Sequence, residues 1–132
     1  MKVVALDFGS ARTGVAVSDE TGTIARPVGI VERAATRDGL TALVELVRSE
    51  GAERVVVGLP LTMRGERGDQ AAETERFVES LRAALDVPVE SFDERFTTDL
   101  AERAQHARAP KDARAAAHLL SSYLAWSTSK SS

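Results

Sequence analysis

The chain has 132 residues, which is the size of one ordinary domain and long enough to bury a core. Hydrophobic residues make up 43% and charged residues 28%, a balance typical of a globular protein, and no apolar run approaches the roughly 20 residues needed to cross a bilayer. The absence of cysteine excludes disulfides, thiolate zinc sites and a cysteine nucleophile. The net charge of -3 argues against a protein that coats nucleic acid through bulk positive charge, although it leaves room for a local basic face.

The first half of the chain predicts three strands and one helix. Apolar, β-rich runs separated by the loop Gly9–Arg12 and by the turn Asp19–Gly22 predict an antiparallel meander. Apolar residues then recur at helical spacing, and Gly51 follows them as a helix C-cap. The run directly behind Met1 is too short for the core of a signal peptide, so we interpret it as a strand of a cytoplasmic protein. The expected bounds are 3–8, 13–18 and 23–31 for the strands and 38–50 for the helix.

The second half predicts two further strands and three helices. The run RVVVGL is apolar on both faces, as expected of a central parallel strand, and VPVESF is a short strand that leads to Asp93. Two segments show the helical spacing of apolar residues, and a threonine cap begins a third helix. The expected bounds are 54–59 and 87–92 for the strands and 69–86, 98–107 and 111–126 for the helices.

This order of elements predicts an α/β fold with a mixed five-stranded sheet. A three-stranded antiparallel meander is followed by two parallel strands, with helices on both faces. We expect one domain over 1–126 and a frayed polar tail over 127–132. If the later strands add beside the first strand, the first strand is central, and its carboxyl end lies near the ends of the fourth and fifth. Open α/β sheets bind their ligands at such an edge.

Acidic residues are expected at this edge of the sheet. Asp7 ends the first strand, Asp93 and Glu94 follow the last strand, and Asp112 starts the final helix. Carboxylates gathered this closely raise each other's pKa unless a cation neutralises them. Hard oxygen ligands favour Mg²⁺ or Mn²⁺, and two such ions roughly 4 Å apart can hydrolyse a phosphodiester. Each acid also has a plain structural interpretation, as a turn residue, a solvated charge or the acid of a helix N-terminus.

Four segments match a known family in order: DFGSARTGVAVSD (7–19), VVVGLPLTMRG (55–65), DERFTT (93–98) and KDARAAAHLLSSYL (111–124). With them the chain resembles, nearly end to end, the YqgF family, also called RuvX, of Holliday-junction-resolvase-like nucleases with a ribonuclease-H-like fold.

The resemblance implies a site and a reaction. By it, Asp7, Glu94 and Asp112 form a catalytic triad that binds Mg²⁺ or Mn²⁺, with Asp93 as a further metal ligand. The implied reaction is endonucleolytic or end-trimming hydrolysis of a phosphodiester, in maturation of the 5′ end of precursor 16S ribosomal RNA. The implied partners are precursor ribosomal RNA or branched DNA and ribosome-assembly particles.

Five basic residues are expected along the same edge and suit contact with a nucleic-acid backbone. They are Arg12, Arg64, Arg67, Arg95 and Lys111. The excess of arginine over lysine favours bidentate contact with phosphate, although coding bias produces the same skew. The stretch before Asp112 is shorter and less basic than in many relatives of the family, which leaves the choice of substrate open. We interpret His106, His118, Tyr123 and Trp126 as surface or packing residues.

Three alternative functions stay open. A Holliday junction resolvase needs two active sites for symmetric cleavage and would act as a homodimer, so monomer and homodimer are both possible. A non-catalytic RNA-binding or junction-binding module would keep the fold, but the intact acids argue against it. The DFGSARTGVAV hairpin also resembles the phosphate-binding loop of actin-like ATPases, which close two such domains over a nucleotide, whereas this chain is long enough for one.

Overall fold

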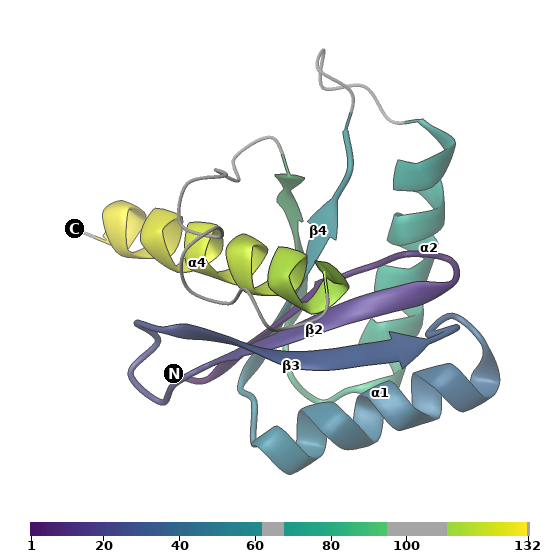
Figure 1. Ribbon diagram of the computed structural model, residues 1–132, viewed down its shortest axis with the longest axis horizontal. Coiled ribbons are helices and arrows are strands. Elements are labelled where there is room, and N and C mark those ends of the chain that lie inside the picture. Colours follow the sequence, from purple (N-terminus) through teal and green to yellow (C-terminus); the bar gives the residue numbers. More distant parts are fainter. Residues whose placement is uncertain (62–67, 95–110, 132) are drawn as a thin grey trace.

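The computed structural model describes residues 1–61, 68–94 and 111–131, and its centre is one mixed five-stranded sheet (Figure 1). The strand β1 pairs antiparallel with β2 and parallel with β4, β2 pairs antiparallel with β3, and β4 pairs parallel with β5. The expected meander followed by two parallel strands, with the first strand central, is therefore confirmed. In spatial order the strands are β3 (Ala25–Glu32), β2 (Arg12–Ser18), β1 (Val3–Asp7), β4 (Arg54–Leu59) and β5 (Val89–Asp93).

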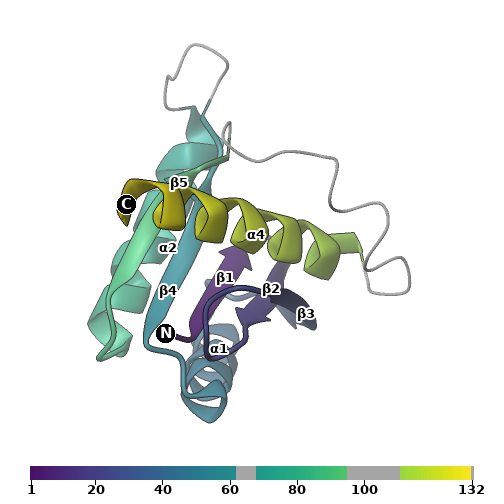
Figure 2. The same ribbon diagram turned by 90° about the vertical axis from the view of Figure 1, so that its left-hand side faces the viewer.

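Helices cover both faces of the sheet, as Figures 1 and 2 show. The helices α1 (Arg37–Glu50) and α2 (Asp69–Ala84) pack on one face, and α4 (Lys111–Ser131) crosses the other. None of the helices in the described part of the chain combines the length and the apolar character needed to cross a membrane.

Each face of the sheet has its own hydrophobic core, because side chains alternate between the two faces along every strand. In β1, Val4 and Leu6 pack toward α1 and α2, whereas Val3 and Ala5 pack toward α4. The helical residues that complete these cores are Leu43, Val47, Phe77 and Leu81 on the first face and Ala116, Leu120 and Tyr123 on the second.

The expected bounds lie within two residues of the observed ones for every described element except α4. The prediction that this helix ends at 126 was wrong, because α4 continues to Ser131. Trp126 packs against Phe92 and Tyr123, with ring centroids 5.6 and 5.9 Å away, and so anchors the helix where it was expected to end. The helix expected over 98–107 lies outside the described residues.

The start of α1 lies in close backbone contact with the turn that follows β3. Thr36 is the N-cap, and its Oγ1 accepts a hydrogen bond from the backbone N–H of Gly39 at 3.2 Å. A Cβ atom on Gly39 would lie 1.9 Å from the carbonyl oxygen of Arg33 and 2.9 Å from the Cα of Ala34. No side chain fits there unless the backbone moves.

We therefore expect Gly39→Ala to lower the free energy of unfolding by about 3 kcal/mol, because the methyl group overpacks against main-chain atoms that cannot turn away. Urea denaturation followed by circular dichroism measures this. The control is Gly68→Ser at the N-cap of α2, where an added Cβ meets nothing within 4 Å and serine caps a helix well. Equal midpoints for Gly39→Ala and the wild type would contradict the contact.

Candidate active site

The carboxyl ends of β1, β4 and β5 lie next to one another at one edge of the sheet. Leu6 of β1 pairs with Val57 of β4, so the next residues along these strands, Asp7 and Gly58, are neighbours. On the other side of β4, strand β5 ends one residue before Glu94. The strand order thus brings Asp7 and Glu94 to the same edge, with one strand between them.

The two acids also share a face of the sheet. Val3 and Ala5 belong to the core under α4, and alternation along β1 puts Asp7 on the same side. Phe92 of β5 belongs to that core as well, and Glu94 follows it two residues later. The side chains of Asp7 and Glu94 are joined by a hydrogen bond. Residues 87 positions apart in the chain therefore meet at one place.

The hydrogen bond joins two carboxyl groups, so one of them must carry the proton. Glu94 is half-buried, and its pKa is raised to about 7. The largest cause is this burial, followed by the charge of Asp7, the hydrogen bond to Asp7 and the charge of Asp93. A carboxylate that has lost hydration and lies beside a second carboxylate is stable only with a proton or a cation. Below about pH 7 the proton remains on Glu94, which then donates to the Asp7 carboxylate.

A glycine lies at the point where Glu94 approaches β4. A Cβ atom on Gly58 would lie 2.7 Å from Oε1 and 3.1 Å from Cγ of Glu94, and 3.1 Å from Cδ2 of Leu119 in α4. The sequence analysis missed this residue. The available signal was a glycine inside an otherwise β-branched strand, which often marks a close approach by another group.

The helix α4 crosses the face of the sheet that Asp7 and Glu94 share (Figures 1 and 2). Tyr123 contacts the beginnings of β4 and β5 through Arg54 and Glu90, whereas Leu119, one turn earlier in α4, reaches Gly58 near the end of β4. From these contacts with β4 and β5 the helix crosses the strands, so that its N-terminal end lies toward β2 and β3 (Figures 1 and 2). Asp112 is the second residue of α4, and its side chain lies outside the described part of the structure.

The pair of carboxyl groups fits a hard divalent cation. Asp7 and Glu94 supply oxygen ligands, and their mutual repulsion is what such an ion neutralises. Mg²⁺ commonly takes one or two carboxylates and keeps several waters. Among the described residues, no three histidine or acidic side chains group closely enough to hold a metal ion. Alternation along β5 places Asp93 on the face opposite Glu94, so it acts on Glu94 through its charge.

The other predicted site residues fall into two groups. Arg12 is exposed and begins β2, beside the end of β1, where Asp7 pairs with Gly14. His118 is buried in α4, as expected of a structural residue, and its ring nitrogens have no hydrogen-bond partner in the described structure. The residues whose side chains lie outside the described part are Arg64, Arg67, Arg95, Lys111 and His106.

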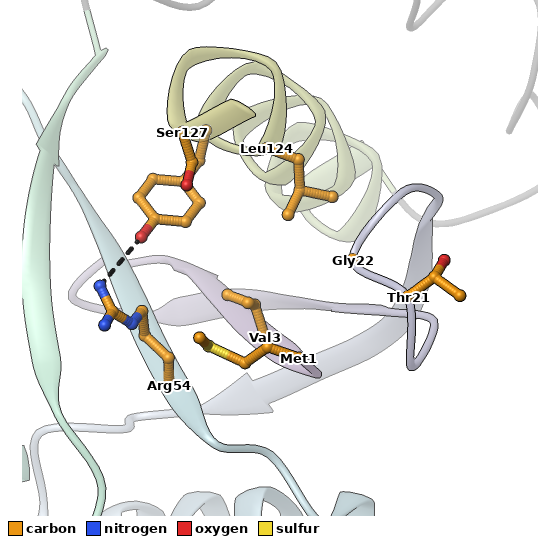
Figure 3. Close-up of a pocket in the computed structure, with 8 residues that line it drawn as sticks. Met1, Val3, Thr21, Gly22, Arg54, Leu124 and Ser127 are labelled. Carbon is orange, nitrogen blue, oxygen red and sulfur yellow. Dashed lines mark hydrogen bonds between the residues drawn. The ribbon is translucent and has the colours of Figure 1, made fainter. Parts of the chain in front are cut away.

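A cavity of about 520 Å³ lies at the opposite end of the sheet, between the start of β1 and the C-terminal half of α4 (Figure 3). Its polar wall is the guanidinium of Arg54, which donates to Glu90 at 3.0 Å and to the Tyr123 hydroxyl at 3.3 Å. Tyr123 in turn donates to Glu90. The three groups bond to one another, although Arg54 Nε is buried without a hydrogen-bond partner in the described structure, and no carboxylate is among the described lining residues. The remaining lining residues are Met1, Val3, Thr21, Gly22, Leu124 and Ser127.

Known proteins resemble this chain in sequence and in fold. A relative from Chloroflexus aurantiacus, named "Putative pre-16S rRNA nuclease", is 48% identical over 101 residues, which cover 76% of this chain and 66%, about two thirds, of that relative. A relative of the same name from Syntrophomonas wolfei is 38% identical over 132 residues, which cover 94% of each chain. The described fold superposes on Thermus thermophilus RuvC in complex with a Holliday junction substrate with a TM-score of 0.69 at 16% identity, covering 100% of this chain and 98% of that one.

The RuvC likeness confirms the predicted α/β fold, since at such low identity it bears on the fold alone. The family model described as "RuvX: Holliday junction resolvase" matches residues 1–126. The family inferred from the four sequence segments is therefore confirmed, and this chain belongs to the RuvX family.

Proposed function

We propose that the protein is a divalent-metal-dependent nuclease that hydrolyses phosphodiester bonds during maturation of the 5′ end of precursor 16S ribosomal RNA. The observation that carries the proposal is the pair of carboxyl groups, Asp7 and Glu94, in contact at the carboxyl edge of the sheet. The names of the two relatives support the RNA substrate, since both are named for pre-16S rRNA.

In this proposal Asp7, Glu94 and Asp112 hold Mg²⁺ or Mn²⁺. The sequence-based expectation that Asp93 is a further ligand is dropped, because alternation along β5 places Asp93 on the opposite face of the sheet. The bound ion supplies activation of a water molecule and stabilisation of the leaving oxygen. Glu94 has to give up its proton before it can serve as a ligand. Arg12, on the exposed start of β2, contacts the phosphate backbone and orients it across the edge. We assign the same role to Arg64, Arg67, Arg95 and Lys111.

A Holliday junction resolvase is the second candidate, because the family description and the RuvC neighbour name that substrate. The chemistry at Asp7 and Glu94 would be the same, but symmetric cleavage needs a homodimer. Purified protein incubated with precursor 16S RNA or with a four-way DNA junction, each with Mn²⁺, Mg²⁺ or chelator, separates the two. We expect metal-dependent cleavage of the RNA, and cleavage of the junction alone would favour the resolvase.

We expect Asp7→Asn to reduce metal-dependent cleavage by at least roughly 100-fold, since even outer-shell partners of a metal contribute 10–100-fold. The substitution removes the charge and keeps the volume, so the thermal unfolding midpoint should not fall. The matched control is Asp86→Asn, an exposed acid in the loop before β5, for which we expect wild-type rates. Full activity of Asp7→Asn would contradict the proposed metal site.

The affinity for Mn²⁺ should depend on pH through Glu94. Because the pKa of this carboxyl is about 7, a proton competes with the ion below that pH and is largely gone above it. Calorimetric titration should show the affinity falling up to about tenfold per pH unit below 7 and becoming constant above roughly pH 8. In Glu94→Gln the affinity should be low and should lose this dependence. An affinity of the wild type that is constant from about pH 5.5 to 8 would rule out Glu94 as a ligand.

Arg12→Ala should weaken RNA binding at low salt and reduce the slope of log K against log salt concentration by about 1, because one phosphate contact is lost. Fluorescence anisotropy at several salt concentrations measures both. Arg48→Ala provides the control. Arg48 lies in the last turn of α1, and its side chain already has a partner within the protein, because it donates to the carbonyl of Ala84 at the end of α2. Identical salt slopes for Arg12→Ala and Arg48→Ala would count against a contact at Arg12.

A further inference from the structure

The contact between Asp7 and Glu94 spans more distance than one strand spacing. The two acids lie at the ends of β1 and β5, and β4 lies between these strands. Neighbouring strands are about 4.8 Å apart, so the backbones of β1 and β5 are separated by nearly 10 Å. Glu94 nevertheless hydrogen-bonds to Asp7. Its side chain must therefore pass over β4, and the residue of β4 that it passes is Gly58, beside Asp7 in the register of the sheet.

The space above Gly58 is filled by the side chain of Glu94. The position that a Cβ atom would take is 2.7 Å from Glu94 Oε1, whereas ordinary van der Waals contact begins at 3.4 Å. A methyl group at residue 58 would thus displace this oxygen by at least about 0.3 Å, since real Cβ contacts are no closer than 3.0 Å, and by about 0.7 Å (3.4 minus 2.7) if ordinary contact is to be reached. Metal sites tolerate deviations of only about 0.2 Å in their ligand distances. The displacement therefore exceeds this tolerance, and Glu94 has to take another path before it can share an ion with Asp7.

The fold itself can accommodate that methyl group. The atoms it would meet are Oε1 and Cγ of Glu94 and Cδ2 of Leu119, all of them in side chains, and two are the outer ends of flexible ones. In a strand, alanine is intrinsically more favourable than glycine by roughly 0.5–1 kcal/mol. Glycine at residue 58 is thus less favourable than alanine for the stability of the strand, but it leaves the space that the side chain of Glu94 occupies.

We infer that Gly58 is a positioning residue of the active site: its lack of a side chain leaves the passage over β4 through which Glu94 reaches Asp7. This inference deepens the proposed function and rests on it where metal binding is concerned. The geometric part, that Gly58 holds Glu94 against Asp7, stands without a metal.

A purely structural role of Gly58, packing against Leu119, makes a different prediction. If the glycine served only to let α4 approach the sheet, an added methyl group would lower the stability and would be relieved by shortening Leu119. If it serves Glu94, the methyl group lowers metal affinity at unchanged stability, and it has little further effect once the side chain at residue 94 is already too short to pass over β4. Double-mutant cycles with Glu94→Asp and with Leu119→Val distinguish these cases.

The test is calorimetric titration of Mn²⁺, without nucleic acid, into the wild type, Gly58→Ala, Glu94→Asp and the double variant, with thermal unfolding of each. We expect Gly58→Ala to weaken Mn²⁺ binding by about tenfold or more with an unfolding midpoint equal to or above that of the wild type. In the Glu94→Asp background, we expect Gly58→Ala to weaken Mn²⁺ binding by less than about twofold. Equal affinity of Gly58→Ala and the wild type, or an equal loss in both backgrounds, would overturn the inference.

A crystal structure of metal-free Gly58→Ala separates failure of this inference from failure of the proposed function. We expect Glu94 to have moved away from Asp7, with their hydrogen bond broken. If the wild type binds no Mn²⁺ but Glu94 is displaced in the variant, the metal proposal fails and the positioning role of Gly58 holds. If the hydrogen bond persists in the variant, the inference is wrong whatever the metal does.

Discussion

The contact between Asp7 and Glu94 is the interaction on which the rest of the site depends, because it joins two groups that repel each other when both are charged. The fold maintains it through three separate features. The central position of β1 and the parallel pairing of β4 and β5 bring the two chain segments to one edge, Gly58 leaves the path between them open, and α4 covers the face on which they meet. Removal of any of these would let the carboxyl groups separate and regain water.

Much of this arrangement was predictable from the pattern of residues. The alternation of side chains along strands and the handedness of parallel crossovers predict the meander and the strand at 54–59, which is apolar on both faces. They also predict that Asp7 and Glu94 lie at strand ends. Side-chain contacts were not predictable in this way. The spacing of acids along the chain says nothing about a proton held between Asp7 and Glu94. Nor does it show that Trp126, where α4 was expected to end, packs against the ring of Phe92 in a distant strand. A glycine in a β-branched strand signals that some group approaches closely, but only the structure shows that this group is Glu94, whose Oε1 lies 2.7 Å from the position of a Cβ on Gly58.

In the proposed reaction a metal held by the carboxyl groups of Asp7 and Glu94 would act in the same way on RNA and on branched DNA, so the choice of substrate would lie outside the pair itself. An exposed arginine lies at the sheet edge that carries the pair, at the start of β2. The other basic residues proposed to contact the nucleic-acid backbone come after β4, after β5 or at the start of α4 in the sequence. A contact to phosphate fixes the position of a nucleic acid without reading its sequence. Discrimination between substrates is then a matter of shape, and of whether one site or two act together.

The central claim is that Asp7 and Glu94 hold a divalent cation together. Crystals grown or soaked in Mn²⁺ and measured near the manganese absorption edge test it most directly, because anomalous scattering identifies the ion and its position. The account predicts an anomalous peak at this edge of the sheet, with carboxylate oxygens of both Asp7 and Glu94 roughly 2.0–2.2 Å from it. A structure in which Mn²⁺ is absent there, while Glu94 stays hydrogen-bonded to Asp7 at a pH well above 7, would contradict it.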